Sequence, residues 1–76
     1  MDKIKEILKR LRPEFNFEAS SDFIEDGFLD SFDIVQIVSE FEENFGVVVD
    51  GLDILPQNFN SFEAMAALIR KSGGTI

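Results

Sequence analysis

The chain has 76 residues, nine phenylalanines and a formal net charge of −8, but no cysteine and no histidine. The missing cysteine excludes disulfides, zinc–thiolate sites and a cysteine nucleophile, and the missing histidine excludes a Ser-His-Asp arrangement. We therefore expect a single domain, residues 1–76, with one small hydrophobic core and no enzymatic activity of its own.

The charges are distributed unevenly along the chain. Between Arg12 and Arg70 there is no lysine or arginine, while thirteen of the fifteen acidic residues fall in that stretch. Such a surface repels nucleic acid and attracts basic protein surfaces. We therefore expect protein partners with basic surfaces and no nucleic-acid partner.

The first predicted helix covers about residues 2–12. An apolar stripe at helical spacing is formed by Ile4, Ile7, Leu8 and Leu11. Pro13 disfavours helical geometry in the residue before it, so the helix should end there. The first residues alternate in charge, unlike a signal peptide, and no apolar run approaches the ~20 residues of a membrane span. We expect a cytoplasmic protein without a membrane span.

A long loop is predicted for residues 13–30. The segment has no sustained hydrophobic period and contains the turn signals Ser20-Ser21-Asp22 and Asp26-Gly27. Loops of more than ~12–15 residues are uncommon in compact domains unless they serve a function. This loop delivers Ser31 to the start of the next helix, which supplies such a function.

The second predicted helix covers about residues 31–45. Its inward stripe consists of Ile34, Ile37, Val38, Phe41 and Phe45. Asp30 or Ser31 is the expected N-cap, and Gly46 is suited to end the helix. A helix start leaves backbone N–H groups without partners inside the helix, and the helix dipole favours negative charge there. A phosphate esterified to Ser31 would therefore suit this position.

The residues around Ser31 suggest a family. A resemblance to the Asp-Ser-Leu attachment motif and second helix of acyl and peptidyl carrier proteins is carried by Asp30-Ser31-Phe32-Asp33, Ile37-Val38, Phe41-Glu42-Glu43 and Phe45-Gly46. It extends through Ile54, Pro56-Gln57-Asn58-Phe59 and Ser61-Phe62-Glu63 to Ile69. The resemblance implies an all-α bundle of three to four helices and a discrete, stand-alone carrier protein. We expect a monomer.

In carrier proteins the serine is an attachment point rather than a catalyst. A phosphopantetheinyl transferase links 4′-phosphopantetheine from coenzyme A to it, and the thiol of this arm carries the cargo as a thioester. The resemblance therefore implies that Ser31 holds the cofactor. It also implies that the chain delivers acyl or aminoacyl groups to loading, acyl-transfer and synthase enzymes, as in fatty acid or polyketide biosynthesis.

Carrier proteins present the second helix to partner enzymes, which implies a docking surface on this chain. Its expected members are Asp30, Phe32, Asp33, Val35, Gln36, Ser39, Glu40 and Glu43. Three positions depart from the pattern of fatty-acid carriers: Phe32 stands where Leu is usual, Gln36 where an acid is common, and Ser39 where an apolar residue is common. These departures leave polyketide, aminoacyl and other specialised pathways open.

Residues 46–59 allow two interpretations. β-Branched residues beside Asp50-Gly51 are a hairpin signal, but an isolated hairpin is marginal in water and no other segment alternates to extend a sheet. We expect an extended loop with Val49 and Ile54 packed inward, followed by a short helical turn that starts at Pro56.

The last predicted helix covers about residues 61–71. Its stripe consists of Phe62, Met65, Ala66 and Ile69. The helix is expected to start at Asn60 or Ser61, and Asn60 and Glu63 resemble a capping box. Residues 72–76 are expected to form a frayed tail.

Two other functions fit parts of the sequence. Residues 22–33 place oxygen donors at several positions of an EF-hand calcium loop, but Ile24 is a poor ligand and Asp33 is too short for the usual bidentate glutamate. A small acidic helical adaptor without a prosthetic group is the stronger alternative. Neither would gain phosphopantetheine on Ser31, and we expect no metal ligands.

Overall fold

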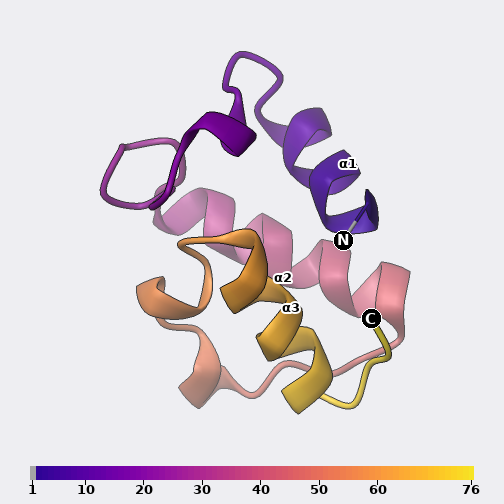
Figure 1. The fold of residues 1–76 in the computed structure, drawn as a ribbon. Helices are drawn as coiled ribbons and strands as arrows, with labels where there is room; N and C mark the ends of the chain where they lie inside the picture. Colours follow the sequence, from indigo (N-terminus) through magenta and orange to yellow (C-terminus); the bar gives the residue numbers. More distant parts are fainter. Residues whose placement is uncertain (1) are drawn as a thin grey trace.

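Helices make up all the regular structure of residues 2–76, the part of the chain that the computed structural model describes. The elements are α1 (Asp2–Leu11), η1 (Phe17–Ala19), α2 (Ser31–Phe45), η2 (Gly51–Asp53), η3 (Pro56–Asn58) and α3 (Phe62–Lys71), where η denotes a 3-10 helix. In Figure 1, α2 crosses the middle of the molecule, with α1 above it and α3 below. The predicted all-α fold class is confirmed. None of the helices described has the length and apolar composition needed to span a bilayer.

The core combines one face of each α-helix with aromatic side chains from the connections. Side chains with at most 1% exposure include Ile4, Ile7 and Leu8 of α1, Ile37 and Phe41 of α2, Met65, Ala66 and Ile69 of α3, and Phe23 and Phe59. Two residues of the predicted α2 stripe, Val38 and Phe45, are only partly buried. Phe45 lies in the last turn of α2, where its ring meets Phe41 edge to face, 5.9 Å between centroids, at the margin of the core.

Phenylalanines tie the long segment between α1 and α2 to the core. Phe15 stacks on Phe28 with ring centroids 4.5 Å apart. Phe17 and Phe62 each meet Phe23 edge to face, at centroid distances of 5.0 and 5.1 Å. Such pairs are worth about 0.5–1.5 kcal/mol each beyond the area they bury. The segment that leads to Ser31 therefore follows a fixed course.

The connection between α2 and α3 contains no strand, in keeping with the loop interpretation. Val49 is buried as expected, but Ile54 is 38% exposed. The Asp50 carboxylate accepts a hydrogen bond from the Leu52 amide at 2.9 Å, and the Ile54 amide donates to the Gly51 carbonyl at 3.3 Å. This tight turn interrupts the alternation of an extended chain, which is why Ile54 points outward.

At the ends of α3, the start agrees with one of the two expected residues, whereas the capping box and the tail differ from the expectation. Its N-cap is Ser61, whose hydroxyl oxygen accepts a hydrogen bond from the Ala64 amide at 3.1 Å, so the predicted capping box starting at Asn60 is wrong. The tail that was expected to fray folds back on α3: the Gly74 amide donates to the Ile69 carbonyl at 2.8 Å. A methyl group added to Gly74 would lie 2.6 Å from the Ile69 side chain, so the tail packs closely.

Truncation of Phe41 should destabilise the protein far more than truncation of Phe32 on the same helix. Phe41→Ala leaves a cavity beneath α2 and should lower the free energy of unfolding by about 3–5 kcal/mol. Phe32 is 68% exposed, so Phe32→Ala should change it by less than about 1 kcal/mol. Urea titrations followed by circular dichroism measure both values. Equal losses would contradict the assignment of the inward face of α2.

Candidate functional site

Ser31 is the first residue of α2, and its side chain is exposed. The chain is fixed just before it, because Leu29 is buried in the core with 3% exposure. Gly27 supports the preceding turn with a φ of 76°, a left-handed conformation that glycine adopts without strain. The fold therefore presents a hydroxyl group to solvent at the N-terminus of its longest helix.

A capping box fixes the start of α2. The Asp30 carboxylate accepts a hydrogen bond from the Asp33 amide at 3.0 Å, and the Asp33 carboxylate accepts one from the Asp30 amide at 3.1 Å. Asp30 is thus the N-cap. These bonds use the N–H groups of Asp30 and Asp33. The N–H groups of Ser31 and Phe32, in the first turn, have no acceptor within the helix. This end of the helix dipole favours an anion.

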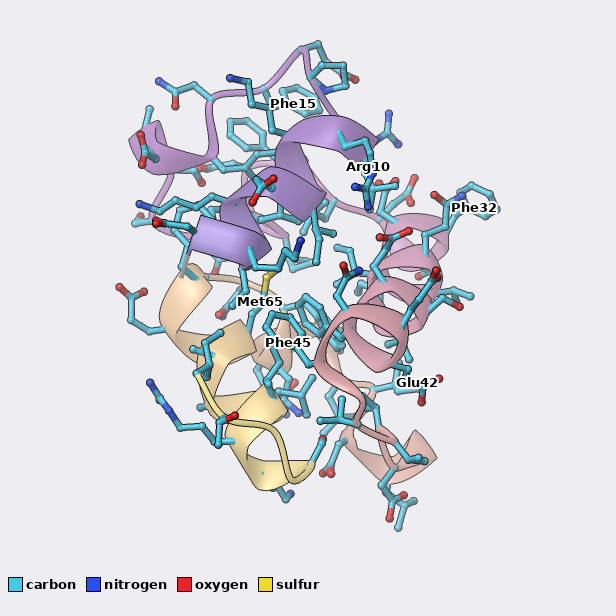
Figure 2. The ribbon with its side chains drawn as sticks, turned by 90° about the vertical axis from the view of Figure 1, so that its right-hand side faces the viewer. Arg10, Phe15, Phe32, Glu42, Phe45 and Met65 are labelled. Atoms are coloured by element: carbon cyan, nitrogen blue, oxygen red, sulfur yellow. The ribbon has the colours of Figure 1, made fainter. Side chains whose placement is uncertain are left out.

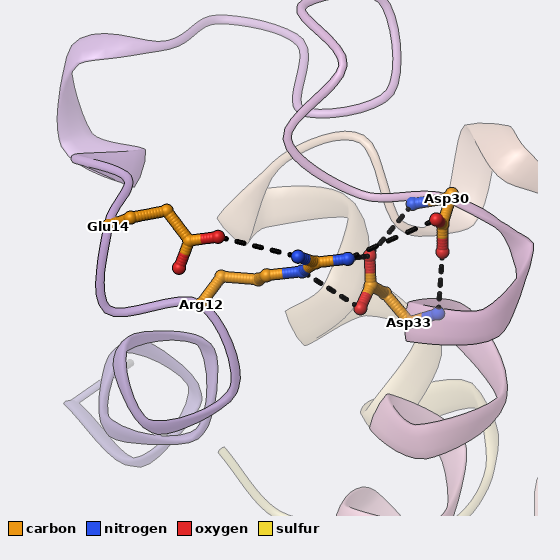
Figure 3. Close-up of polar contacts among 4 residues, drawn as sticks. All are labelled: Arg12, Glu14, Asp30 and Asp33. Atoms are coloured by element: carbon orange, nitrogen blue, oxygen red, sulfur yellow. Dashed lines mark hydrogen bonds and ion pairs between the residues drawn. The ribbon is translucent and has the colours of Figure 1, made fainter.

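Arg12, the residue directly after α1, binds the capping box. Its Nε and Nη2 atoms donate to the two carboxylate oxygens of Asp33 at 3.1 and 3.0 Å. Nη2 also lies 3.9 Å from an Asp30 carboxylate oxygen, and Nη1 donates to Glu14 at 3.4 Å. Figure 3 shows the guanidinium group among these three carboxylates. A paired geometry of this kind is stronger and more directional than a single contact.

The pKa values follow from this geometry. Burial would by itself raise the pKa of Asp33, but hydrogen bonds from Arg12 and the Asp30 backbone, together with the Arg12 charge, outweigh it and lower the pKa below its ordinary value of about 3.8. The hydrogen bond and charge of Asp33 likewise raise the pKa of Arg12. Asp33 is therefore ionised at neutral pH, although only 5% of it is exposed.

The structure changes the roles of two expected docking residues. Asp33 is too deeply buried to contact a partner, because its carboxylate holds Arg12 and the start of α2. Glu40 is half-buried and engaged within the fold, since its carboxylate accepts hydrogen bonds from Arg10 and from the Asn44 side chain. Asp33 is therefore removed from the expected docking residues, and the Glu40 carboxylate is already paired with Arg10.

The other expected docking residues do lie on an accessible surface. Phe32 and Val35 are 68% and 62% exposed, large values for apolar side chains. Figure 2 shows Phe32 projecting away from the body of the molecule. Their polar neighbours are the N-cap Asp30 and, on α2 itself, Gln36, Ser39 and Glu43, of which only Gln36 is partly buried. We call this surface, with Glu40 at its edge, the α2 face.

Sequence reasoning missed two features. The first is Arg12, which the pattern presented only as a cation at the end of a helix; its one signal is that it is the last cation before the acidic stretch. The second is a group of exposed apolar residues around η2: Val48 and Leu52 are more than 80% exposed, and Leu55 is 41% exposed. One indication of these exposed residues was present in the sequence: Leu52 directly follows the turn signal Asp50-Gly51.

Acidic residues of the segment before α2 stabilise turns. The Asp22 carboxylate accepts hydrogen bonds from the Ile24 and Glu25 amides at 3.1 and 2.9 Å. The Ser20 hydroxyl donates to Asp26 at 2.5 Å. Across residues 2–76, no three acidic side chains are grouped so that they could hold a metal ion. The geometry of this segment therefore lends no support to an EF-hand.

A surface pocket of about 410 Å³ lies away from Ser31. It is lined by Lys5, Lys9, Pro13, Phe15, Asn16, Phe17, Glu18 and Phe62. Lys5 pairs with Glu18 at 2.9 Å and lies over the Phe62 ring, 5.4 Å from its centroid. The pocket is thus closed in part by contacts within the fold and is separate from the serine.

Comparison with known protein families gives a match over most of the chain. A family model described as "Phosphopantetheine attachment site" matches residues 1–69. The matched range includes α1, α2, most of α3, Ser31 and the Arg12–Asp33 pair. Comparisons with curated proteins and with solved structures give no match.

The ionised state of Asp33 should be visible in the pH dependence of stability. Because its pKa is lower in the folded chain, its contribution is fully present above the unfolded value of about 3.8 and is lost as the pH falls through the lowered folded value. Asp33→Asn should lower the free energy of unfolding by about 1–3 kcal/mol at pH 7, because Arg12 loses its charged partner. This difference from the wild type should shrink below pH ~4.

Urea titrations of the wild type and of Asp33→Asn between neutral pH and pH ~2.5 measure the free energy of unfolding of each. Subtracting one value from the other at each pH removes the contribution of the other acidic residues, which titrate in both proteins. A difference that stays constant across this range would show that the Asp33 carboxyl does not titrate as described.

Proposed function

Because the chain belongs to the family of phosphopantetheine attachment sites, whose members carry 4′-phosphopantetheine covalently, we propose that Ser31 is the residue to which this group is attached. One observation carries the proposal: Ser31 is an exposed hydroxyl at the N-terminus of α2, held by a capping box on either side of it. The amides of Ser31 and Phe32 suit the phosphate that attachment would place there.

We propose that a separate transferase catalyses the attachment, with coenzyme A as the donor of the group. The Ser31 hydroxyl attacks the β-phosphate of coenzyme A and forms a phosphodiester. The bond between the two phosphates breaks, adenosine 3′,5′-bisphosphate leaves, and the hydroxyl proton passes to a base of the transferase. We propose that metal and base both belong to the transferase and that the chain itself is not a catalyst.

The modified chain would act as a carrier of thioesters. The chain has no cysteine, so the reactive thiol is that of the arm. Acyl or aminoacyl groups bound to this thiol would pass between loading, acyl-transfer and synthase enzymes. Fatty acid and polyketide biosynthesis are the pathway types that the proposal includes.

We propose that partner enzymes dock on the α2 face. Phe32 and Val35 supply an exposed apolar centre close to Ser31, and Asp30 and Glu43 supply acidic groups around it. Exposed charges of this kind mainly raise association rates with basic surfaces and make them sensitive to salt. Gln36, Ser39 and Glu40 complete the face.

The second candidate is an adaptor without a prosthetic group. It is favoured by the exposed apolar side chains in η2 and on either side of it, because large exposed apolar side chains are suited to contacts with another protein. The two functions differ in covalent chemistry, because only a carrier is modified at Ser31.

Intact mass spectrometry tests the attachment site directly. After incubation with coenzyme A, Mg²⁺ and a promiscuous phosphopantetheinyl transferase, the wild type should gain the mass of one phosphopantetheine. Ser31→Ala should gain none, while Ser21→Ala, which removes an exposed serine of the preceding segment, should be modified like the wild type. A folded wild type that gains no mass would favour the adaptor.

Charge reversal on the α2 face should slow the same reaction. Glu43→Lys should lower kcat/KM for modification several-fold at low salt, and the loss should shrink as salt screens the charges. Glu63→Lys, an equal change on the exposed side of α3, is the matched control and should have little effect. Equal rates for the wild type and Glu43→Lys across the salt series would exclude this part of the α2 face from docking.

A further inference from the structure

One cation reaches the acidic start of α2. The chain has no lysine or arginine from residue 13 to residue 69, and Asp26, Asp30 and Asp33 surround the position of Ser31 in the sequence. Arg12 comes from outside this stretch and pairs with two of these acids, Asp30 and Asp33. The packing of α1 against α2 therefore supplies the positive charge that the local sequence lacks.

The position of Arg12 is set by the fold. Its amide donates to the Leu8 carbonyl at 2.9 Å, which continues the last turn of α1. Leu8 and Ile4 of the same helix are fully buried. Buried residues of α1 therefore fix the backbone at Arg12. The Arg12 side chain extends from this fixed point to α2.

The contact reaches the backbone beside Ser31 through one carboxylate oxygen. Asp33 Oδ2 accepts a hydrogen bond from Arg12 Nη2 at 3.0 Å and another from the Asp30 amide at 3.1 Å. Asp30 is the residue directly before Ser31. Figure 3 shows this continuous path from α1 to the start of α2. A displacement of the Asp33 carboxylate would therefore weaken its hydrogen bond with the Asp30 amide, directly before the serine.

We propose that Arg12 is a positioning residue for the modification of Ser31: it holds Asp33 so that the start of α2 keeps its shape, and it offsets the charge of the two carboxylates flanking the serine. The substrate is the anionic diphosphate of coenzyme A, which two uncompensated carboxylates would repel. Arg12 acts through Asp33 rather than on the reacting atoms. This inference rests on the proposed attachment at Ser31.

Single substitutions separate the charge of Arg12 from its geometry. Arg12→Gln removes the charge and the paired contact, and it should lower kcat/KM for modification about 10-fold, since small displacements near a reacting group have effects of this order or larger. Arg12→Lys keeps the charge but not the two parallel hydrogen bonds, and it should fall between Arg12→Gln and the wild type. Lys9→Gln, an equal loss of charge from exposed α1 surface, should change the rate less than about twofold.

A double substitution distinguishes positioning from a general loss of stability. Arg12→Gln alone leaves the buried Asp33 carboxylate without its charged partner. The double variant Arg12→Gln/Asp33→Asn removes this charge, and the side-chain oxygen of the new amide can still accept a hydrogen bond from the Asp30 backbone N–H. We expect this variant to recover kcat/KM to within about threefold of the wild type. Ile69→Val, a core change of about 0.5–1.5 kcal/mol, should not alter the rate although it lowers stability.

Two outcomes would overturn the inference: a rate for Arg12→Gln equal to that of the wild type, or a double variant no faster than Arg12→Gln. A wild type that is not modified at all would instead overturn the proposed function. In that case the rate of hydrogen exchange at the Asp30 amide still tests whether Arg12 holds the start of α2. It should be about 10-fold faster in Arg12→Gln than in Lys9→Gln if Arg12 holds the start of α2, and equal in both if it does not.

Discussion

The contact between Arg12 and Asp33 is the interaction on which the arrangement of this protein depends. A carboxylate with 5% exposure is tolerated only when it is paired and hydrogen-bonded, and Asp33 receives three hydrogen bonds from two partners, Arg12 and the Asp30 backbone. The same bonds join the end of α1 to the first turn of α2. One buried charge thus connects the packing of two helices to the shape of the backbone at Ser31.

The division of charge along the chain has a structural counterpart. Cations lie on α1 and at the end of α3, and most of them pair with acids of the central stretch, as Lys5 does with Glu18 and Lys71 with Asp53. The pairs between exposed residues add little to stability. These pairs neutralise part of the charge of the acidic stretch.

Features set by neighbouring residues could be predicted from the sequence, and features set by distant ones could not. The all-α class and the family resemblance are confirmed, because helical periodicity and the motif around Ser31 are local. The Arg12–Asp33 contact joins residues 21 positions apart and could not be seen in a helical pattern. Asp33 was therefore assigned to the surface, although it is buried. Ile54 was placed inward because the turn at η2 was not recognised, and the return of the tail onto α3 depends on the space left for Gly74.

The anchored segment before α2 has a consequence for how a carrier of this shape would reach its partners. Phe23 holds the segment by its ring contacts and by its amide, which donates to the Asn60 carbonyl at 2.8 Å just before α3. The segment that leads to the serine is thus connected by direct contacts to α3, and Arg12 connects its end to α1. A cargo at this point would search a volume fixed by the length of its arm alone. Its effective concentration at a partner's active site would then depend on where that partner docks, with no contribution from motion of the protein backbone.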